Sequence, residues 1–259
     1  MVRLKSSDLK DFLDGKVKLY NSPLFIKSDP VSIPHRFQKK EDIEIAGFLT
    51  ASIAWGKRSI ILDNASNLLH RMDNAPFDFI TNFSKNDCSD FKNFVHRTFN
   101  GIDCIFFLNA LKKIYKEKKT LEYFFVHFSE KQNNSDYKEA INGLREFFFS
   151  IPHPSRTQKH FANPFAGSAA KRINMFLRWM IRNDANGVDF GLWNLNPALL
   201  TCPLDVHSGR VARKLGLLKR NQNDWKAAAE LTLNLKKFDS SDPVKYDFAL
   251  FGLGVFENF

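Results

Sequence analysis

The chain is poor in cysteine, and this scarcity excludes two kinds of protein. Its 259 residues include three cysteines, Cys88, Cys104 and Cys202. Their odd number and wide spacing exclude a disulfide framework, and three thiols cannot supply the four ligands of a cysteine-held iron–sulfur cluster. Free thiols suit the reducing cytoplasm, where we expect the protein to act. We expect no iron–sulfur cluster, no metal and no other cofactor.

A long apolar segment is also missing. Residues 1–6, MVRLKS, carry charges with no apolar run after them, and no stretch of about 18 uninterrupted apolar residues occurs elsewhere. We therefore expect neither a signal peptide nor a membrane span, and no membrane partner.

Acidic residues are outnumbered by basic ones. The chain has 38 Lys and Arg against 28 Asp and Glu, a formal net charge of +10 and a pI near 9.5. This excess favours a polyanionic partner. Nucleic acid is preferred to a membrane surface because no long amphipathic basic segment is present. An ordinary basic protein explains the charge equally well.

Alternating runs of β-branched residues are rare, whereas apolar residues recur at helical spacing along almost the whole chain. Apolar residues make up 44% of the chain, ample for the core of one large domain or two small ones. We therefore predict an all-α protein. The predicted helices are residues 43–55, 59–72, 91–97, 102–115, 121–128, 137–149, 224–237 and 244–256, with another inside 163–182.

Local signals mark two helix starts and two irregular segments. Thr120 is predicted to cap the helix that follows it, and Asp242, with Pro243 in the first turn, to cap the last helix. Residues 151–164 contain three prolines and several basic residues, and we expect a surface loop on the side of the partner. Residues 183–200 form a turn-rich insert.

Two segments bring together residue types that support chemistry. Residues 203–217 read PLDVHSGRVARKLGL, so Asp205 and His207 open a basic helix. An acid in the first turn is favoured by the helix dipole, and a capping role explains part of this pattern. Residues 163–182 read NPFAGSAAKRINMFLRWMIR, a turn that leads into a helix with Lys171 near its start. A lysine and an aspartate at two helix starts are suited to amine-based nucleophilic catalysis.

The order of these segments resembles the helix-hairpin-helix-GPD superfamily of DNA glycosylases, which includes endonuclease III and the 8-oxoguanine DNA glycosylases. The similar segments are IEIAGFLTASIAWGKR at 43–58, GSAAKRIN at 167–174, PLDVHSGRVARKLGL at 203–217 and YDFALFGLGV at 246–255. The combination of LRWMIR, VDFGLW and PVKYDFALFGLGVF resembles a bacterial branch distinct from the well-studied enzymes.

The resemblance carries an expected fold and an expected domain organisation. It implies a two-lobed helical bundle of the glycosylase type over residues 41–256, with lobes of roughly 41–150 and 160–256. Residues 1–40 are then an N-terminal extension that packs on the core. An exchange of terminal segments between the lobes stays open.

The same resemblance implies base-excision DNA repair, with Lys171 and Asp205 as the catalytic residues. Lys171 would attack the sugar of a damaged nucleotide, such as an oxidised purine, flipped out of double-stranded DNA. A nucleophilic lysine needs burial or cationic neighbours to lower its pKa, and Arg172 lies beside it. Asp205 would stabilise the positive charge that develops on the sugar, or accept a proton from the amine. A lysine Schiff base would add AP-lyase activity, which cuts the strand; a water directed by Asp205 would give base removal alone.

Further residues are assigned to DNA contacts and to a base pocket. The DNA contacts are Gly167, Ser168, Arg172, His207, Arg210 and Arg58, and the pocket residues are Met175 and Trp179. Each has a plain alternative: Lys171 and Arg58 as solvated surface residues, His207 as a partner of local backbone groups, and the pocket residues as core. The hairpin also keeps a single glycine, Gly167, where the family is richer in glycine for close approach to phosphate.

Two other function classes stay open. A non-catalytic nucleic-acid-binding protein would retain the scaffold without excision, and the glycine-poor hairpin suits this alternative. It predicts binding that falls steeply with salt and shows no lesion preference. A structural or protein-interaction role predicts no nucleic-acid affinity even at low salt.

Overall fold

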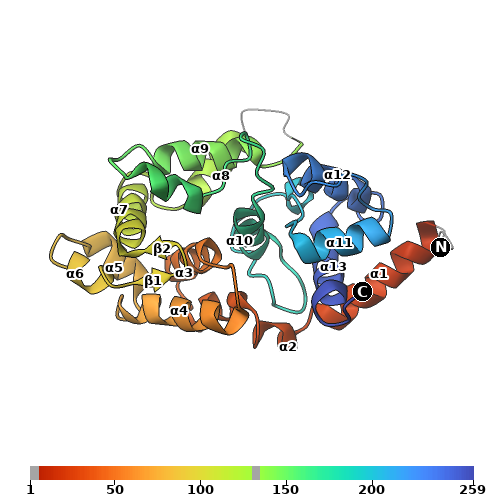
Figure 1. Cartoon of the computed structure of the whole chain (residues 1–259), viewed down its shortest axis with the longest axis horizontal. Coiled ribbons are helices and arrows are strands. Elements are labelled where there is room, and N and C mark those ends of the chain that lie inside the picture. The colour runs from red at the N-terminus through yellow and green to blue at the C-terminus, as the bar shows by residue number, and fades with distance from the viewer. Residues whose placement is uncertain (1–5, 130–134) are drawn as a thin grey trace. The chain divides into compact units, whose positions relative to one another are not determined.

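The computed structural model describes residues 6–129 and 135–259, and almost all of its regular structure is helical (Figure 1). The predicted all-α class is confirmed. The α-helices are α1 Ser6–Tyr20, α2 Pro23–Ile26, α3 Lys40–Ser52, α4 Arg58–His70, α5 Pro76–Asn82, α6 Cys88–Phe91, α7 Gly101–Lys118, α8 Glu122–Ser129, α9 Lys138–Phe148, α10 Lys171–Ile181, α11 Val206–Lys214, α12 Trp225–Lys236 and α13 Tyr246–Val255. The strands are β1 Val95–His96 and β2 Phe99–Asn100.

The predicted helix at 91–97 is wrong. Helix α6 ends at Phe91, and Val95 of β1 pairs with Asn100 of β2 in an antiparallel hairpin. Arg97 occupies the turn with a φ of 55°, in the left-handed region that a helix interior does not allow. Phe91 and Phe94 are both buried, and their spacing of three imitates a helical face.

The chain divides into two compact units. The central unit comprises residues 28–162. The terminal unit comprises residues 1–27 and 163–259, so helix α1 belongs with the C-terminal half of the chain. Of the N-terminal extension predicted over residues 1–40, residues 1–5 lie outside the described residues.

Phenylalanine forms much of the core of the central unit. The ring of Phe107 lies 4.8 Å from that of Phe148 and 5.1 Å from that of Phe99, in edge-to-face geometry. A buried carboxylate, Glu44, accepts hydrogen bonds from the hydroxyls of Tyr115 and Thr120 at 2.7 Å. Thr120 also accepts a bond from the N–H of Glu122 at the start of α8, as its predicted capping role requires.

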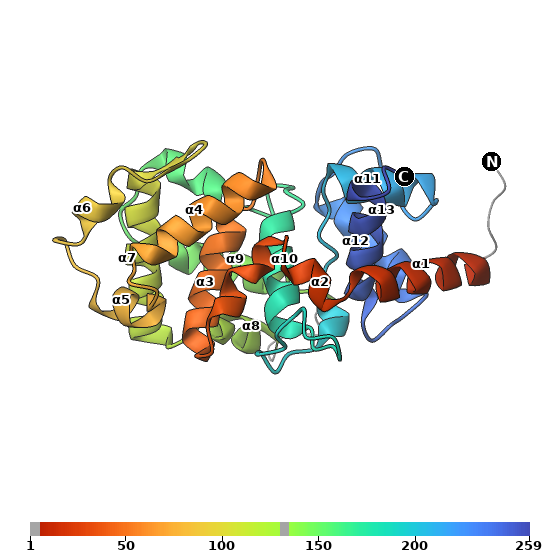
Figure 2. The same cartoon turned by 90° about the horizontal axis from the view of Figure 1, so that it is seen from below.

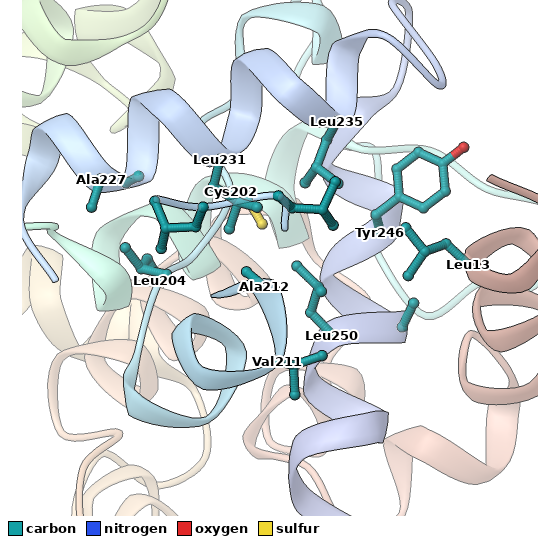
Figure 3. Packing of buried hydrophobic residues seen from close by; sticks show 14 of the residues in the cluster. Leu13, Cys202, Leu204, Val211, Ala212, Ala227, Leu231, Leu235, Tyr246 and Leu250 are labelled. Atoms are coloured by element: carbon teal, nitrogen blue, oxygen red, sulfur yellow. The ribbon is translucent and has the colours of Figure 1, made fainter. Parts of the chain in front are cut away.

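The terminal unit has an aliphatic core built by α1, α11, α12 and α13 (Figure 3). Leu231 of α12 and Leu250 of α13 are fully buried there together with Leu13 of α1. Helix α1 contacts α13 and crosses it at an angle (Figure 2). At this contact the Lys16 ammonium lies 2.7 Å from the Glu257 carboxylate.

The predicted cap of the last helix is wrong. Pro243 opens a short 3₁₀ turn, α13 begins at Tyr246, and the side chain of Asp242 makes no capping hydrogen bond. Its carboxylate instead accepts a bond from Nε of Arg182 at 2.8 Å. A charged guanidinium is a stronger partner for a carboxylate than a backbone N–H, and it holds the Asp242 side chain away from the helix start.

Candidate functional site

A tight turn leads into α10 and places Lys171 at the first position of that helix. The side chain of Asn163 accepts hydrogen bonds from the N–H groups of Phe165 and Ala166 at 2.9 and 3.2 Å. Gly167 follows with a φ of +89°, a conformation that favours glycine. Ala170 then lies in the left-handed region, with a φ of 50°, directly before Lys171.

The hydrogen bonds of this turn are largely internal. Besides the two N–H groups bound by Asn163, that of Gly167 donates to the carbonyl of Pro164 and that of Ser168 to the carbonyl of Asn163, both at 3.1 Å. The N–H of Ala170 donates to the Ser168 hydroxyl at 3.2 Å. Gly167 and Ser168 are exposed, but their backbone donors already have partners within the turn.

Asp205 forms the N-cap of α11, as its local sequence suggested. Its Oδ1 accepts hydrogen bonds from the N–H groups of His207 and Ser208 at 2.8 and 3.0 Å. The Ser208 hydroxyl accepts a bond from the N–H of Asp205 at 3.0 Å, which completes a capping box. These contacts fix the carboxylate at the start of the helix and direct its second oxygen elsewhere.

That second oxygen faces Lys171. Nζ of Lys171 lies 3.7 Å from Oδ2 of Asp205, and the two side chains are 28% and 26% exposed. Burial raises the pKa of Asp205, but the Lys171 ammonium and the N–H groups of Ser208 and His207 outweigh it and hold the pKa below its usual value. The structure therefore joins the predicted lysine and aspartate in one partly accessible pair.

Arg172 adds a second cation next to Lys171. Burial lowers the pKa of Arg172 to about 10, which still leaves its guanidinium charged at neutral pH. The start of α10 therefore carries two adjacent positive charges, with the Asp205 carboxylate paired to the first of them.

Helix α10 also contributes to a buried charge cluster that was not predicted from the sequence. Arg178 of α10 binds Asp247 of α13 at 2.5 Å and Asp189 of the insert at 3.2 Å. Arg182, one turn later, binds Asp189 at 3.0 Å and also contacts Asp184 and Asp242. An available signal was the presence of two arginines, four residues apart, on a helix that is otherwise apolar at its C-terminal end.

Asp247 links this cluster electrostatically to the Lys171–Asp205 pair. Burial raises the pKa of Asp247 to about 6, although the charges of Arg178 and Lys171 lower it; the charge of Asp205 raises it further. Asp247 is thus a buried carboxyl group whose pKa lies above the ordinary range and responds to the charges of both predicted catalytic residues.

The remaining predicted residues occupy different environments. His207 is exposed at the start of α11, whereas Nη2 of Arg210 donates to the carbonyl of Gly254 at 3.0 Å. Met175 is 7% exposed and Trp179 is fully buried, as core residues would be. Arg58 is the first residue of α4 in the central unit.

Within residues 6–129 and 135–259, no group of three or more His, Cys, Asp or Glu side chains is arranged to hold a metal ion. None of the helices in the same residues combines the length and apolar character that crossing a bilayer requires.

The chain resembles known proteins at the level of a family. No curated protein and no solved structure is significantly similar to it. Residues 29–256, which include Lys171, Asp205 and Asp247, match the family described as "Protein of unknown function (DUF2400)", and the chain belongs to this family.

Proposed function

We propose that the protein is a DNA N-glycosylase of base-excision repair that removes a damaged base and cuts the strand through a lysine Schiff base. The observation that supports this proposal is the pair formed by Lys171 and Asp205, whose Nζ and Oδ2 atoms lie 3.7 Å apart at the starts of two helices. An amine and a carboxylate held together in this way are the groups that nucleophilic displacement of a base requires.

The chemistry begins with a nucleotide flipped out of the duplex, at a cost of a few kcal/mol. Lys171 gives up a proton to water, and its Nζ lone pair attacks C1′ as the glycosidic bond breaks. The base leaves with the bonding electrons and takes up a proton from water. The Asp205 carboxylate stabilises the positive charge that develops on the sugar. Its fixed position costs no rearrangement at that moment, because two backbone N–H groups of α11 already hold it.

The second half of the reaction cuts the strand. Opening of the sugar ring gives a Schiff base between Nζ and C1′. Loss of a proton from C2′ then expels the 3′ phosphate by β-elimination, and water hydrolyses the Schiff base to restore the amine. An oxidised purine such as 8-oxoguanine is the first lesion to test.

Trapping with borohydride tests the proposal, because hydride reduces the Schiff base to a stable secondary amine. Wild-type protein should form a covalent adduct with duplex DNA that contains an abasic site or 8-oxoguanine. Lys171→Gln should abolish the adduct. Lys214→Gln, a change of an exposed lysine on α11, should leave it intact. Absence of an adduct with wild type across a panel of lesions would overturn the lyase chemistry.

A non-catalytic DNA-binding protein is the second candidate, and one observation favours it. Both carboxylate oxygens of Asp205 are engaged, one by the N–H groups of α11 and the other by Lys171, so the pair also serves to join α10 to α11. This candidate predicts salt-dependent binding to duplex DNA with no released base, no nick and no trapped adduct.

A further inference from the structure

The loop between α11 and α12, residues 219–223, is held in a fixed shape by one arginine. Nε of Arg213 donates to the carbonyl of Arg220 at 2.9 Å, and Nη2 donates to the carbonyl of Asn221 at 2.9 Å. Nη2 also bonds Oδ1 of Asn223 at 2.7 Å. Because a single planar guanidinium holds several acceptors of the loop, the loop is ordered without any ligand.

Two hydrogen bonds fasten this loop to the candidate site. Nδ2 of Asn223 donates to the carbonyl of Asp205 at 3.1 Å. Just beyond the loop, the N–H of Trp225 donates to the carbonyl of Gly167 at 3.1 Å. The loop therefore touches both the cap of α11 and the turn that precedes Lys171, all within the terminal unit.

The side chains of the loop present positive charge to solvent. Lys219, Arg220 and Lys226 line an open hollow together with the amides of Asn221 and Gln222 and the carboxylate of Glu230. Arg220 is paired with Asp224, which lies 2.5 Å from it, and an oxygen of Glu230 accepts a bond from the backbone N–H of Lys219. No ion pair of 4 Å or less engages the ammonium groups of Lys219 and Lys226 within the described part of the chain, so the hollow keeps an excess of positive charge.

The turn before Lys171 is poorly equipped to bind a phosphate. Its N–H groups at Gly167 and Ser168 donate within the turn, so they cannot also donate to an anion without breaking those bonds. A strand that places a nucleotide at Lys171 still needs its flanking phosphates neutralised. The exposed lysines on the ordered loop next to the turn are suited to this task.

We propose that Lys219 and Lys226 bind phosphates of the DNA backbone beside the nucleotide held at Lys171 and Asp205. The inference rests on the proposed function for the position of that nucleotide. The exposed amides of Asn221 and Gln222, between the two lysines in the hollow, can donate to the same phosphates. The ligand is a phosphodiester backbone, so the contact is independent of base sequence.

The salt dependence of binding to an undamaged duplex tests this surface. Each phosphate contact contributes about 0.9 to the slope of log K against log salt, so Lys219→Ala with Lys226→Ala should reduce the slope by about 1.8. The matched control is Lys18→Ala with Lys237→Ala. It removes the same charge from the terminal unit, and Lys237 lies at the opposite end of α12 from Lys226. The control should keep the wild-type slope.

An unchanged slope in the Lys219 and Lys226 variant, or an equal reduction in the control, would overturn the inference. All four lysines are exposed, so neither variant should disturb the fold, and circular dichroism should confirm this. If the wild type binds DNA but is never trapped, the proposed chemistry fails. The salt slopes of the two double variants then still test whether Lys219 and Lys226 bind phosphates. If the wild type is trapped but the two double variants have the same salt slope, the phosphate-binding role of Lys219 and Lys226 is wrong and the proposed chemistry stands.

Discussion

Nη1 of Arg178 lies 2.5 Å from Oδ2 of Asp247, and both side chains are almost completely buried. The pair joins α10, which begins with Lys171, to α13, the last helix of the chain. Arg178 also binds Asp189, so the insert at 183–200 is attached to the same point. These contacts of Arg178 connect three segments of the terminal unit.

Replacing Asp247 by Asn should change how stability depends on pH. The pKa of Asp247 is raised to about 6 from an ordinary value of 3.8, so the unfolded chain ionises first as the pH rises. The stability that this group contributes is therefore lost between about pH 4 and pH 6, by on the order of 3 kcal/mol. The difference in free energy of unfolding between Asp247→Asn and wild type, measured by urea denaturation, should therefore shift by that amount in favour of the variant from pH 4 to pH 7. Asp78→Asn, an exposed control, should show no such trend; parallel curves for Asp247→Asn and wild type would refute the prediction.

Two substitutions of Asp205 should separate its structural role from its chemical one. Asn retains a side-chain oxygen for the N–H groups of His207 and Ser208, whereas Ala removes the cap, so Asp205→Ala should be less stable than Asp205→Asn by about 1 kcal/mol. Both should reduce borohydride trapping about 100-fold, because both remove the charge that faces Lys171. Denaturation and trapping should be measured on the same preparations. Full trapping by Asp205→Asn would remove Asp205 from the chemistry.

A methyl group at Gly252 should loosen α1 from α13. A Cβ atom built there overlaps the ring of Tyr20, so Gly252→Ala should destabilise the protein by roughly 1–3 kcal/mol. In a Tyr20→Ala background the same change should cost much less, which a double-mutant cycle would measure. Gly15→Ala is the matched control. It lies in α1 with open space around it and should instead stabilise the helix by roughly 0.5–1 kcal/mol.

Helix α12 offers a paired test of the aliphatic core shown in Figure 3. Leu231 is fully buried in the core, and Leu233 on the same helix is 64% exposed. Leu231→Ala should therefore cost about 2–5 kcal/mol in the free energy of unfolding, and Leu233→Ala less than about 0.5 kcal/mol. Chemical denaturation of the two variants checks the prediction. Equal losses would mean that the assigned face of α12 is wrong.

The sequence predicted those features that depend on near neighbours. The helical class and the cap at Asp205 follow from spacing and from the residues beside each helix start. The hairpin at 95–100 was missed because buried Phe91 and Phe94 follow a helical interval, and the left-handed turn at Arg97 has no glycine to mark it. Short strands of this kind leave little periodic signal.

Ion-pair partners that lie far apart in the sequence could not be predicted from local sequence patterns. Arg178 and Asp247 are 69 positions apart, and nothing near either residue indicates the other. The same applies to the carboxylate of Asp242, which a local signal assigned to a helix cap and which Arg182 binds instead. The approach of Lys171 to Asp205 was expected from a family resemblance, since the spacing of 34 positions does not itself require it.

The division of the chain has a consequence for its biosynthesis. The central unit consists of one continuous stretch of sequence, residues 28–162, so it can form its native contacts as soon as it emerges from the ribosome. Helix α1 is translated before that unit, and α13, on which it packs, is translated after it. The apolar face of α1, with Leu9 and Leu13, therefore stays uncovered until α13 has been made, and a nascent-chain chaperone could shield it during that interval.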